Sequence, residues 1–327
     1  SYCSKAMVFD THTHTLFCRH AALYMPRAVV AAANARGLKG VAMCCHCPMP
    51  EQYDYKHRMT MEEWPSFVDV VARERELCAQ MYPDITTTFN LEVDYHPPMM
   101  SHLRDLTATP GLDCVLGSVH FNQPEEQARL RALDVDGCVE AYFSQVGEAA
   151  SSGLFNVMAH LDFIRFRMIS IGHRDFTLTP EDAHFRHVLT CLDAIKAAGV
   201  AVEINTSSVA KGFKDHFPSE PIIRAAVERG IPLVLSSDAH RPEHVGRGFL
   251  TALKTLEACG ASHVSHFIGG QRYETPLGDA LAAVSSHASD RAVEQVIEEA
   301  RPMLWAGVEG GDVLDAVAAV SARAGQR

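Results

Sequence analysis

Histidine and acidic residues stand directly after a series of short apolar runs in this chain. The first are His12 and His14, and two histidines at positions i and i+2 of an extended segment point to one side and can hold one metal ion. Residues of the same types after later runs, or in the loop after the first, are His20, His46, Glu92, His120, His160, Asp238 and His240. One catalytic zinc needs three protein ligands and a water, so this set predicts two or three divalent ions. Imidazole together with carboxylate favours Zn, Fe or Mn over Mg or Ca.

Seven short apolar runs, rich in Val, Ile, Leu or Phe, are typical of strands that are buried on both faces. They cover residues 7–9, 38–44, 85–91, 113–119, 155–159, 200–204 and 232–235. Helical patterns cover residues 27–36, 61–81, 136–151, 180–198, 221–229 and 244–258, whereas 122–135 and 165–178 are expected to be irregular loops. This alternation predicts a parallel sheet with helical crossovers, and we expect one (β/α) barrel over residues 1–280. Because the C-terminal ends of barrel strands meet on one face, the candidate ligands are expected to meet there.

Composition and charge narrow the class of protein. The chain has 327 residues with 29 Lys and Arg against 40 Asp and Glu, and its net charge of −11 argues against a broad surface for nucleic acid or an anionic membrane. No run approaches the ~18 apolar residues of a membrane span, and residues 1–7 lack the apolar segment of a signal peptide. Ten cysteines, several of them single within apolar runs, predict reduced buried thiols in a cytoplasmic protein. Residues 281–327 contain Ala-rich runs that predict a helical appendage, packed on the barrel or on a partner subunit of a homo-oligomer.

The strings around these residues resemble the motifs of the PHP (polymerase and histidinol phosphatase) family. The strings are His12-Thr13-His14, Cys44-Cys45-His46-Cys47-Pro48-Met49-Pro50, Leu91-Glu92-Val93-Asp94-Tyr95, Gly117-Ser118-Val119-His120-Phe121, Ala159-His160-Leu161-Asp162, Glu203-Ile204-Asn205-Thr206-Ser207 and Ser237-Asp238-Ala239-His240. The third, fourth and sixth resemble its histidinol-phosphatase branch in particular. The resemblance runs in order from about residue 7 to about residue 277.

The resemblance implies a distorted (β/α)7 TIM-like barrel with a trinuclear metal site. Carried over residue by residue, the first ion would take His12, His14, Glu92 and Asp238, the second would share Glu92 and add His120 and His160, and the third would take His20, His46 and His240. Cys45 stands where the family usually has Asp before the histidine, which puts the support of His46 in question. The family pattern does not account for the chain from residue 281 onward.

A phosphorylated substrate would need cations and hydrogen-bond donors near the metals. Arg165 and Arg167 follow His160 and could give bidentate contacts, and Ser207 and Lys211 could add a hydroxyl and a cation. The alternative for the arginines is an ion pair or solvation, and the alternative for Lys211 is an ordinary surface lysine. The predicted reaction is in-line attack of a metal-activated hydroxide on phosphorus. Candidate proton donors for the leaving oxygen are Asp94 and Asp162.

The resemblance makes histidinol-phosphate phosphatase the leading hypothesis: L-histidinol phosphate and water would give L-histidinol and phosphate, with no nucleic-acid or membrane partner. Another PHP phosphoesterase, acting on a different small phosphate or a nucleotide, is the alternative. The third hypothesis is a metal-dependent amidohydrolase, which usually needs a metal-bridging lysine after a middle strand, and no strand end here supplies one. The fourth is a metal-binding scaffold without turnover.

Cys44 and Cys47 are interpreted as buried small hydrophobes because no second C-x-x-C follows. The remaining histidines, His216 and His266 among them, are expected at the surface.

Overall fold

The computed structural model describes residues 7–22, 24–50, 53–54, 56–285 and 288–305. Within them, nine strands form one sheet in chain order, in which each strand from β1 to β7 pairs in parallel with the next. The strands are β1 (Phe9–Asp10), β2 (Gly40–Met43), β3 (Thr86–Asp94), β4 (Cys114–Ser118), β5 (Val157–Met158), β6 (Ala201–Asn205), β7 (Leu233–Ser236), β8 (His263–Ile268) and β9 (Gln271–Pro276). Strand β9 pairs antiparallel with β8.

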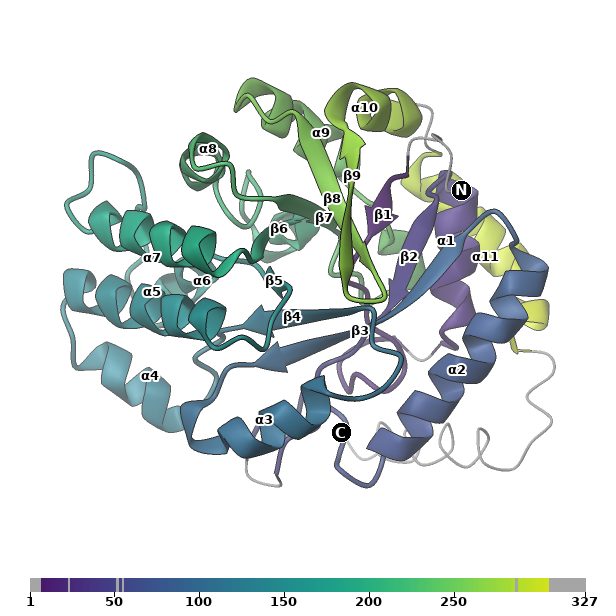
Figure 1. Ribbon diagram of the computed structural model, residues 1–327, viewed down its shortest axis with the longest axis horizontal. Coiled ribbons are helices and arrows are strands. Elements are labelled where there is room, and N and C mark those ends of the chain that lie inside the picture. Colours follow the sequence, from purple (N-terminus) through teal and green to yellow (C-terminus); the bar gives the residue numbers. More distant parts are fainter. Residues whose placement is uncertain (1–6, 23, 51–52, 55, 286–287, 306–327) are drawn as a thin grey trace.

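The sheet curls until β1 lies beside β7 (Figure 1). No ladder joins these two strands in the described part of the chain. Near their C-terminal ends, however, the Thr11 N–H donates to the Leu235 carbonyl at 3.2 Å and the His14 N–H donates to the Ala239 carbonyl at 2.7 Å. Strand β8 pairs with β7 only at Val234, which leaves the C-terminal end of β7 open to β1. The fold is therefore the distorted TIM-like barrel that was predicted, with an incomplete seam between its first and seventh strands.

Helices cover the outside of the curled sheet (Figure 1). They are α1 (Arg27–Arg36), α2 (Trp64–Met81), α3 (Met100–Thr107), α4 (Pro124–Arg131), α5 (Val135–Ser151), α6 (Ile164–Ser170), α7 (Phe185–Ala198), α8 (Glu220–Glu228), α9 (Phe249–Ala258), α10 (Leu277–Ser285) and α11 (Asp290–Trp305), with 3-10 turns η1 (Pro97–Met99), η2 (Thr206–Lys211) and η3 (Pro242–His244). The six predicted helical segments correspond to α1, α2, α5, α7, α8 and α9. Helix α8 shows the apolar face typical of such helices, with Ile222, Ile223 and Ala226 buried.

Some sequence-based expectations about elements were wrong. Helix α4 lies where a loop was expected, since Pro124 occupies its first turn and the Glu126 side chain accepts the Gln123 backbone N–H at 3.0 Å. Helix α6 lies in the other expected loop and is held by buried Ile164 and Met168, one turn apart. The β8–β9 hairpin was not predicted, although Gly269 and Gly270 both adopt the positive φ of a tight turn, at 57° and 74°.

The C-terminal helices of the described chain lie against the barrel (Figure 1). Helix α11 packs on α1 and on η3. At this junction Arg36, which is 5% exposed, donates to the Asp290 carboxylate at 2.7 Å and to the Val245 and Glu243 carbonyls at 2.9 and 3.0 Å. The start of α11 is thereby tied to the loop after β7. Residues 306–327 of the predicted appendage lie outside the described residues.

Two histidines expected at the surface are buried, at 5% exposure for His216 and 4% for His266, so that expectation was wrong for both. The His266 ring stacks on Phe9 with centroids 4.2 Å apart and faces Tyr273 on its other side at 5.7 Å. An aromatic stack between two strands is thus its structural role. Among the described helices, none has both the length and the apolar character needed to cross a bilayer.

Candidate metal centre

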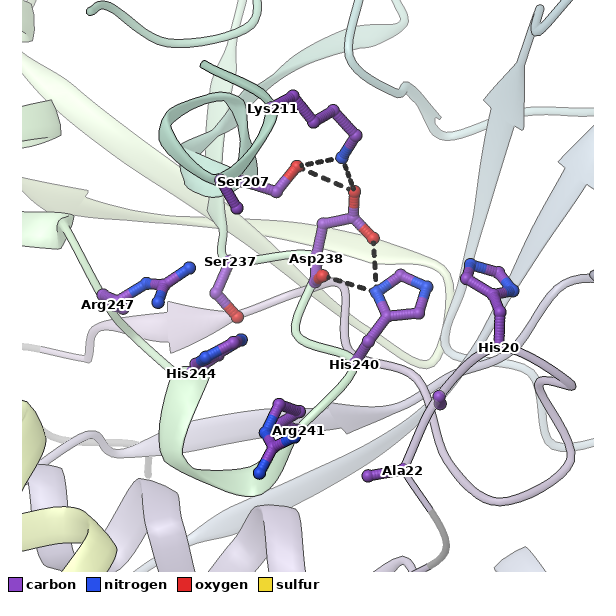
Figure 2. Close-up of a pocket in the computed structure, with 12 residues that line it drawn as sticks. His20, Ala22, Ser207, Lys211, Ser237, Asp238, His240, Arg241, His244 and Arg247 are labelled. Atoms are coloured by element: carbon purple, nitrogen blue, oxygen red, sulfur yellow. Dashed lines mark hydrogen bonds and ion pairs between the residues drawn. The ribbon is translucent and has the colours of Figure 1, made fainter. Parts of the chain in front are cut away.

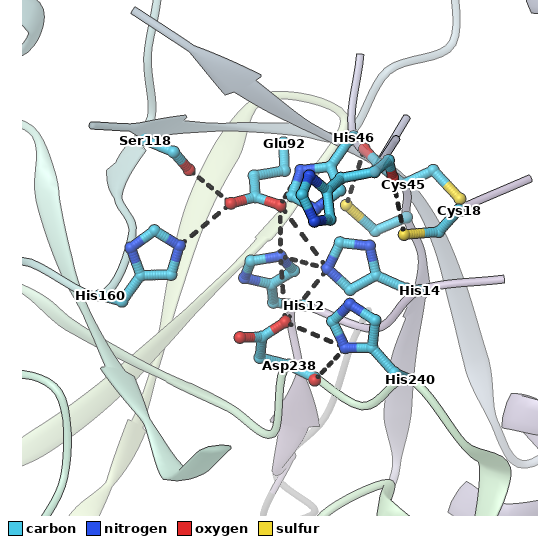
Figure 3. Close-up of polar contacts among 12 residues, drawn as sticks. His12, His14, Cys18, Cys45, His46, Glu92, Ser118, His160, Asp238 and His240 are labelled. Atoms are coloured by element: carbon cyan, nitrogen blue, oxygen red, sulfur yellow. Dashed lines mark hydrogen bonds and ion pairs between the residues drawn. The ribbon is translucent and has the colours of Figure 1, made fainter. Parts of the chain in front are cut away.

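The nine predicted ligands come together at the C-terminal ends of the strands. Figure 3 labels all of them except His20 and His120. His12 and His14 follow β1, Glu92 lies within β3 near its end, and Asp238 follows β7. Their side chains are almost fully buried, with exposures of 0%, 0%, 1% and 8%. A buried group of imidazoles and carboxylates of this size is stable only if its lone pairs and charges are matched by cations or protons.

The first cluster consists of His12, His14 and Asp238. The two Nε2 atoms of His12 and His14 are 3.0 Å apart, and His14 Nε2 is 3.1 Å from Asp238 Oδ1. Glu92 approaches the same point, with its Oε2 3.2 Å from His12 Nε2. These four residues are the set that the resemblance implied for the first ion.

The second cluster consists of Glu92, His120 and His160. Glu92 Oε1 lies 3.0 Å from His160 Nε2 and 3.4 Å from His120 Nε2, and the two Nε2 atoms are 3.2 Å apart. The two oxygens of Glu92 therefore face different clusters, which is the arrangement expected of a carboxylate that joins two ions.

The third cluster contains His46 and His240 together with His14 and Cys18. The His20 ring lies beside it, with centroid distances of 4.3 Å to His240 and 5.5 Å to His46, and His20 Nδ1 is 3.3 Å from Cys18 Sγ. The three histidines predicted for this position are thus close together. The thiol of Cys18 was not singled out from the sequence.

These clusters fit divalent ions on the evidence of their donor atoms. Unprotonated Nε2 atoms that face each other at 3.0 and 3.2 Å repel unless a cation or a proton lies between them. Tetrahedral zinc with Zn–N bonds of 2.0–2.1 Å sets its ligand nitrogens about 3.3 Å apart, close to both separations. His240 Nε2 is buried and has no hydrogen-bond partner among the described residues, so it is available to an ion.

Two buried carboxylates orient the histidines from behind. Glu203 on β6 accepts the His12 Nδ1 hydrogen at 2.7 Å, which leaves the His12 Nε2 lone pair aimed at the first cluster. Asp94 does the same for His120 at 2.5 Å, and the guanidinium of buried Arg58 donates to its other oxygen. Carboxylate–histidine pairs of this kind fix the tautomer and raise the basicity of a metal ligand. The sequence analysis overlooked Glu203 as a site residue and considered Asp94 as a proton donor, not as the partner of His120.

Protonation of the histidines follows from burial and from their neighbours. Burial lowers the pKa of His14 well below its usual value and that of His20 to about 2, and the neighbouring imidazoles of His240 and His46 act in the same direction. Burial acts in the same direction on His12, but Glu203, Glu92 and Asp238 outweigh it and raise the pKa of His12 well above 6.5. His14 and His20 are therefore neutral, the form that binds metal, whereas His12 must give up a proton to an incoming ion.

The loop that carries Asp238 is tied to β1 by Asp10. One Asp10 oxygen accepts the Ser237 N–H at 2.9 Å, and the other accepts the Gly246 N–H at 2.8 Å. Asp238 has a φ of 49° and His160 a φ of 26°, in a region that side-chain-bearing residues rarely adopt. Glu203 accepts the strained His160 N–H at 2.6 Å. Asp10 and Glu203 thus hold the backbone of the site, and Glu203 also orients the His12 ring.

A cavity of about 430 Å³ opens beside the first and third clusters (Figure 2). His20, Asp238 and His240 line it, and so do two of the four predicted phosphate contacts. Ser207 donates to Asp238 Oδ2 at 3.0 Å, and Lys211 donates to the Ser207 hydroxyl at 2.8 Å. Lys211 Nζ is 3.6 Å from the same carboxylate oxygen.

The other two predicted phosphate contacts lie elsewhere. Arg165 is held by Asp162 at 2.8 Å and Asp215 at 2.9 Å and donates to the His216 carbonyl at 2.6 Å. Arg167 lies at the opposite end of the site, where it donates to the His120 carbonyl at 2.6 Å and to the Asn122 side chain.

The two predicted proton donors are both buried. Burial alone would raise the pKa of Asp94, but the charges of Arg58 and His120 outweigh it and lower the pKa below its usual range. Burial raises the pKa of Asp162 to about 6, and this carboxylate is 0% exposed and accepts the Ser219 N–H at 2.9 Å. Neither residue lines the cavity.

Comparison with known families agrees with this geometry. Residues 10–207 match the PHP domain, and residues 220–255 match a PHP-associated segment. The chain therefore belongs to the PHP family. A probable histidinol-phosphatase of Deinococcus radiodurans is 34% identical over 78% of this chain and 95% of that protein. A histidinol-phosphatase of Bacillus subtilis is 24% identical over 73% of this chain and 96% of that protein, so the predicted histidinol-phosphatase branch, a group of phosphoric monoester hydrolases, is confirmed.

Two solved structures share the fold. The histidinol phosphate phosphatase HisK of Lactococcus lactis, solved with Zn, L-histidinol and phosphate, superposes with a TM-score of 0.62 at 17% identity and covers 83% of this chain and 100% of its own. A putative histidinol phosphatase of Listeria monocytogenes superposes with a TM-score of 0.61 at 20% identity over 74% of this chain and 99% of its own.

Proposed function

We propose that this protein is a metal-dependent phosphomonoesterase that hydrolyses L-histidinol phosphate to L-histidinol and phosphate. The observation that carries the proposal is the set of three clusters that share Glu92 or His14, together with a cavity beside the first and third clusters that Lys211 and Ser207 help to line. The relatives named histidinol-phosphatase support this substrate, and so does the histidinol and phosphate bound in the Lactococcus lactis enzyme. The free, buried thiols of the described cysteines are compatible with a cytoplasmic location.

The ions would be held by His12, His14, Glu92 and Asp238, by Glu92, His120 and His160, and by His20, His46 and His240. When bound, divalent ions would supply Lewis acidity that lowers the pKa of a water molecule and offsets the charge of the phosphoryl oxygens. The protein's part is to keep these ligands in place and to fix which ring nitrogen of a histidine faces the ions. Glu203 and Asp94 do so for His12 and His120, and Asp10 does so for the loop of Asp238.

The four predicted phosphate contacts receive different roles in this proposal. We assign Lys211 and Ser207 to the phosphate because both line the cavity beside Asp238. Arg167 would act at the His120 end of the site. Arg165 instead holds the segment around Asp215 and His216 through its ion pairs, because its guanidinium is already bonded on every side that faces them.

The leaving oxygen needs a proton. Asp94 is ionised through Arg58 and His120, so it has no proton to give, and we assign it to positioning His120. Asp162 is sealed from solvent by its bonds to Ser219 and Arg165. Both predicted donors are therefore poorly placed, and water at the mouth of the cavity is the proposed proton source.

Phosphate release by metal-loaded protein tests the proposal. Histidinol phosphate is compared with a panel of sugar and nucleotide monophosphates, with Glu92→Gln as the inactive control. A preference for histidinol phosphate by orders of magnitude, lost in Glu92→Gln, supports the proposal. A preference for another small phosphate favours the alternative PHP phosphoesterase. Release from none of them, by protein that holds its metal, rules out a phosphomonoesterase and leaves the amide-hydrolysis and scaffold hypotheses.

A further inference from the structure

The cavity beside Asp238 is positively charged except for that one ligand. Its lining contains Lys211, Arg241 and Arg247, and Asp238 is the single acidic residue in it. Because Asp238 belongs to the first cluster, its charge is available to an ion and not to the contents of the cavity. A cavity of this kind attracts an anion and disfavours an amine.

The three cations differ in what already neutralises them. Lys211 bonds to Ser207 and lies close to Asp238. Arg241 forms an ion pair with Glu243, and its side chain is 60% exposed. Arg247 is partly buried and, in the described part of the chain, its guanidinium makes no hydrogen bond and no ion pair. A partly buried guanidinium next to a reaction centre retains five donors for a ligand.

The backbone of Arg247 is fixed. Its carbonyl accepts the Thr206 hydroxyl at 2.7 Å, and its N–H donates to the His244 carbonyl at 3.0 Å. The residues on both sides, Gly246 and Gly248, adopt φ values of 67° and 78° that favour glycine. Figure 2 shows the side chain directed toward Ser207 and Ser237, on the side of the cavity away from His20. The guanidinium is thus presented from a rigid turn to the interior of the cavity.

We propose that Arg247 is a specificity-determining residue that contacts the phosphoryl oxygens of the substrate, so that the phosphate end occupies this cavity and the cationic amino-alcohol end lies outside it. The proposal rests on the proposed function for the identity of the substrate, but the oxyanion contact itself does not. A planar guanidinium with free donors binds two oxygens of a phosphate at once, which selects a dianionic phosphate over a carboxamide or a neutral alcohol.

The test uses full-length, metal-loaded protein and the variants Arg247→Gln, Arg247→Lys and Arg241→Gln. Arg241→Gln is the matched control, since it removes a guanidinium from the same cavity that is already paired with Glu243. Two quantities are measured for each: the dissociation constant of inorganic phosphate by calorimetry, and KM and kcat for histidinol phosphate. Metal content and thermal stability are measured alongside.

We expect Arg247→Gln to weaken phosphate binding and raise KM by a similar factor, roughly 10- to 100-fold, with metal content unchanged. Arg247→Lys recovers part of the loss, because charge remains without the two-oxygen contact, and Arg241→Gln stays within about twofold of the wild type. Unchanged phosphate affinity in Arg247→Gln, an equal loss in Arg241→Gln, or a loss that follows lost metal overturns the proposal.

The two proposals fail in different ways. If no phosphomonoester is hydrolysed but Arg247→Gln still weakens inorganic phosphate binding, the proposed function is wrong and the oxyanion contact stands. If histidinol phosphate is hydrolysed with wild-type KM by both Arg247 variants, the contact is wrong and the proposed function stands. Arg247→Lys keeps the contact testable if Arg247→Gln does not fold.

Discussion

Replacement of Glu203 by Gln tests how much the orientation of the His12 ring contributes to metal binding, because the candidate metal ligands themselves are left in place. Glu203 is 0% exposed and accepts four hydrogen bonds: from His12 Nδ1 at 2.7 Å, Ser236 Oγ at 2.6 Å, the His160 N–H at 2.6 Å and Asn205 Nδ2 at 3.1 Å. A glutamine has one acceptor oxygen and one amide group where the glutamate has two acceptors. One side of this network must then lose its acceptor.

The two orientations of the amide have different costs. If its NH2 faces His160, two N–H donors oppose each other at a residue whose φ is already strained at 26°. If the NH2 faces His12, the imidazole must carry its hydrogen on Nε2, which removes the lone pair from the first cluster. The first outcome disturbs His160 and weakens the second ion, whereas the second disturbs His12 and weakens the first ion. Changes of this kind typically cost 10- to 100-fold in metal affinity, or about 1.4–2.7 kcal/mol.

The assay is competition of each variant against a chelator of known affinity, with zinc as the probe. Glu74→Gln is the control because Glu74 is also a buried carboxylate, 4% exposed, but it pairs with Arg27 on the outside of the barrel. We expect Glu203→Gln to lose affinity at one ion and Glu74→Gln to lose stability only. A folded Glu203→Gln protein with wild-type zinc affinity at every site would refute the role of Glu203.

Four further outcomes are expected. Removal of the ions by a chelator lowers the melting temperature by several degrees, since ligands that bind only the native state stabilise it by about 4 kcal/mol at 1,000 times Kd; an unchanged melting temperature would show that the clusters hold no ion. Burial lowers the pKa of His266 to about 4, so the stability that its neutral ring contributes, at most about 3 kcal/mol, is present above pH 6.5 and is lost as the pH falls toward 4. The variant His266→Phe is expected to flatten this part of the curve of stability against pH. An unaltered curve would contradict this role of His266. Arg165→Met leaves buried Asp162 without its cation and costs about 3–5 kcal/mol in urea unfolding, with little change in phosphate affinity; the reverse pattern would return Arg165 to the phosphate. Gly40→Ala places a Cβ against the Phe9 ring and costs about 1–3 kcal/mol in the same assay, and a neutral result would mean that the ring moves freely.

The sequence predicted correctly those elements that have a clear apolar or helical periodicity, and those site residues that directly follow such an element. Seven of the strands and six of the helices follow from apolar runs and helical spacing, and Asp238 and His240 were found because they stand where a strand ends. The β8–β9 hairpin was missed because its outer strand is exposed and polar, so no apolar run marks it. Helix α6 was missed because seven residues give too few turns for a periodic pattern.

Glu203, which the sequence analysis overlooked, contacts the candidate ligand His12 and does not itself face an ion position. Glu203 lies in the middle of an apolar run, and a charge in a buried strand always needs a partner, which is a signal that could have been used. Cys18, Arg58 and Arg247 gave no such signal. They lie in loops, and only the tertiary fold brings these loops close to the site. The spacing of residues in the sequence does not predict such contacts.

The seam between β1 and β7 has a kinetic consequence. Its hydrogen bonds join residues 224 and 227 positions apart, from Thr11 to Leu235 and from Ser237 to Asp10. Contacts of such long range form late, after most of the chain between them has ordered. The first cluster spans this seam, so we expect it to form as a binding site only after the folding transition state. Zinc is therefore expected to slow unfolding while leaving the refolding rate unchanged. It would stabilise the closed barrel and would take no part in the folding nucleus.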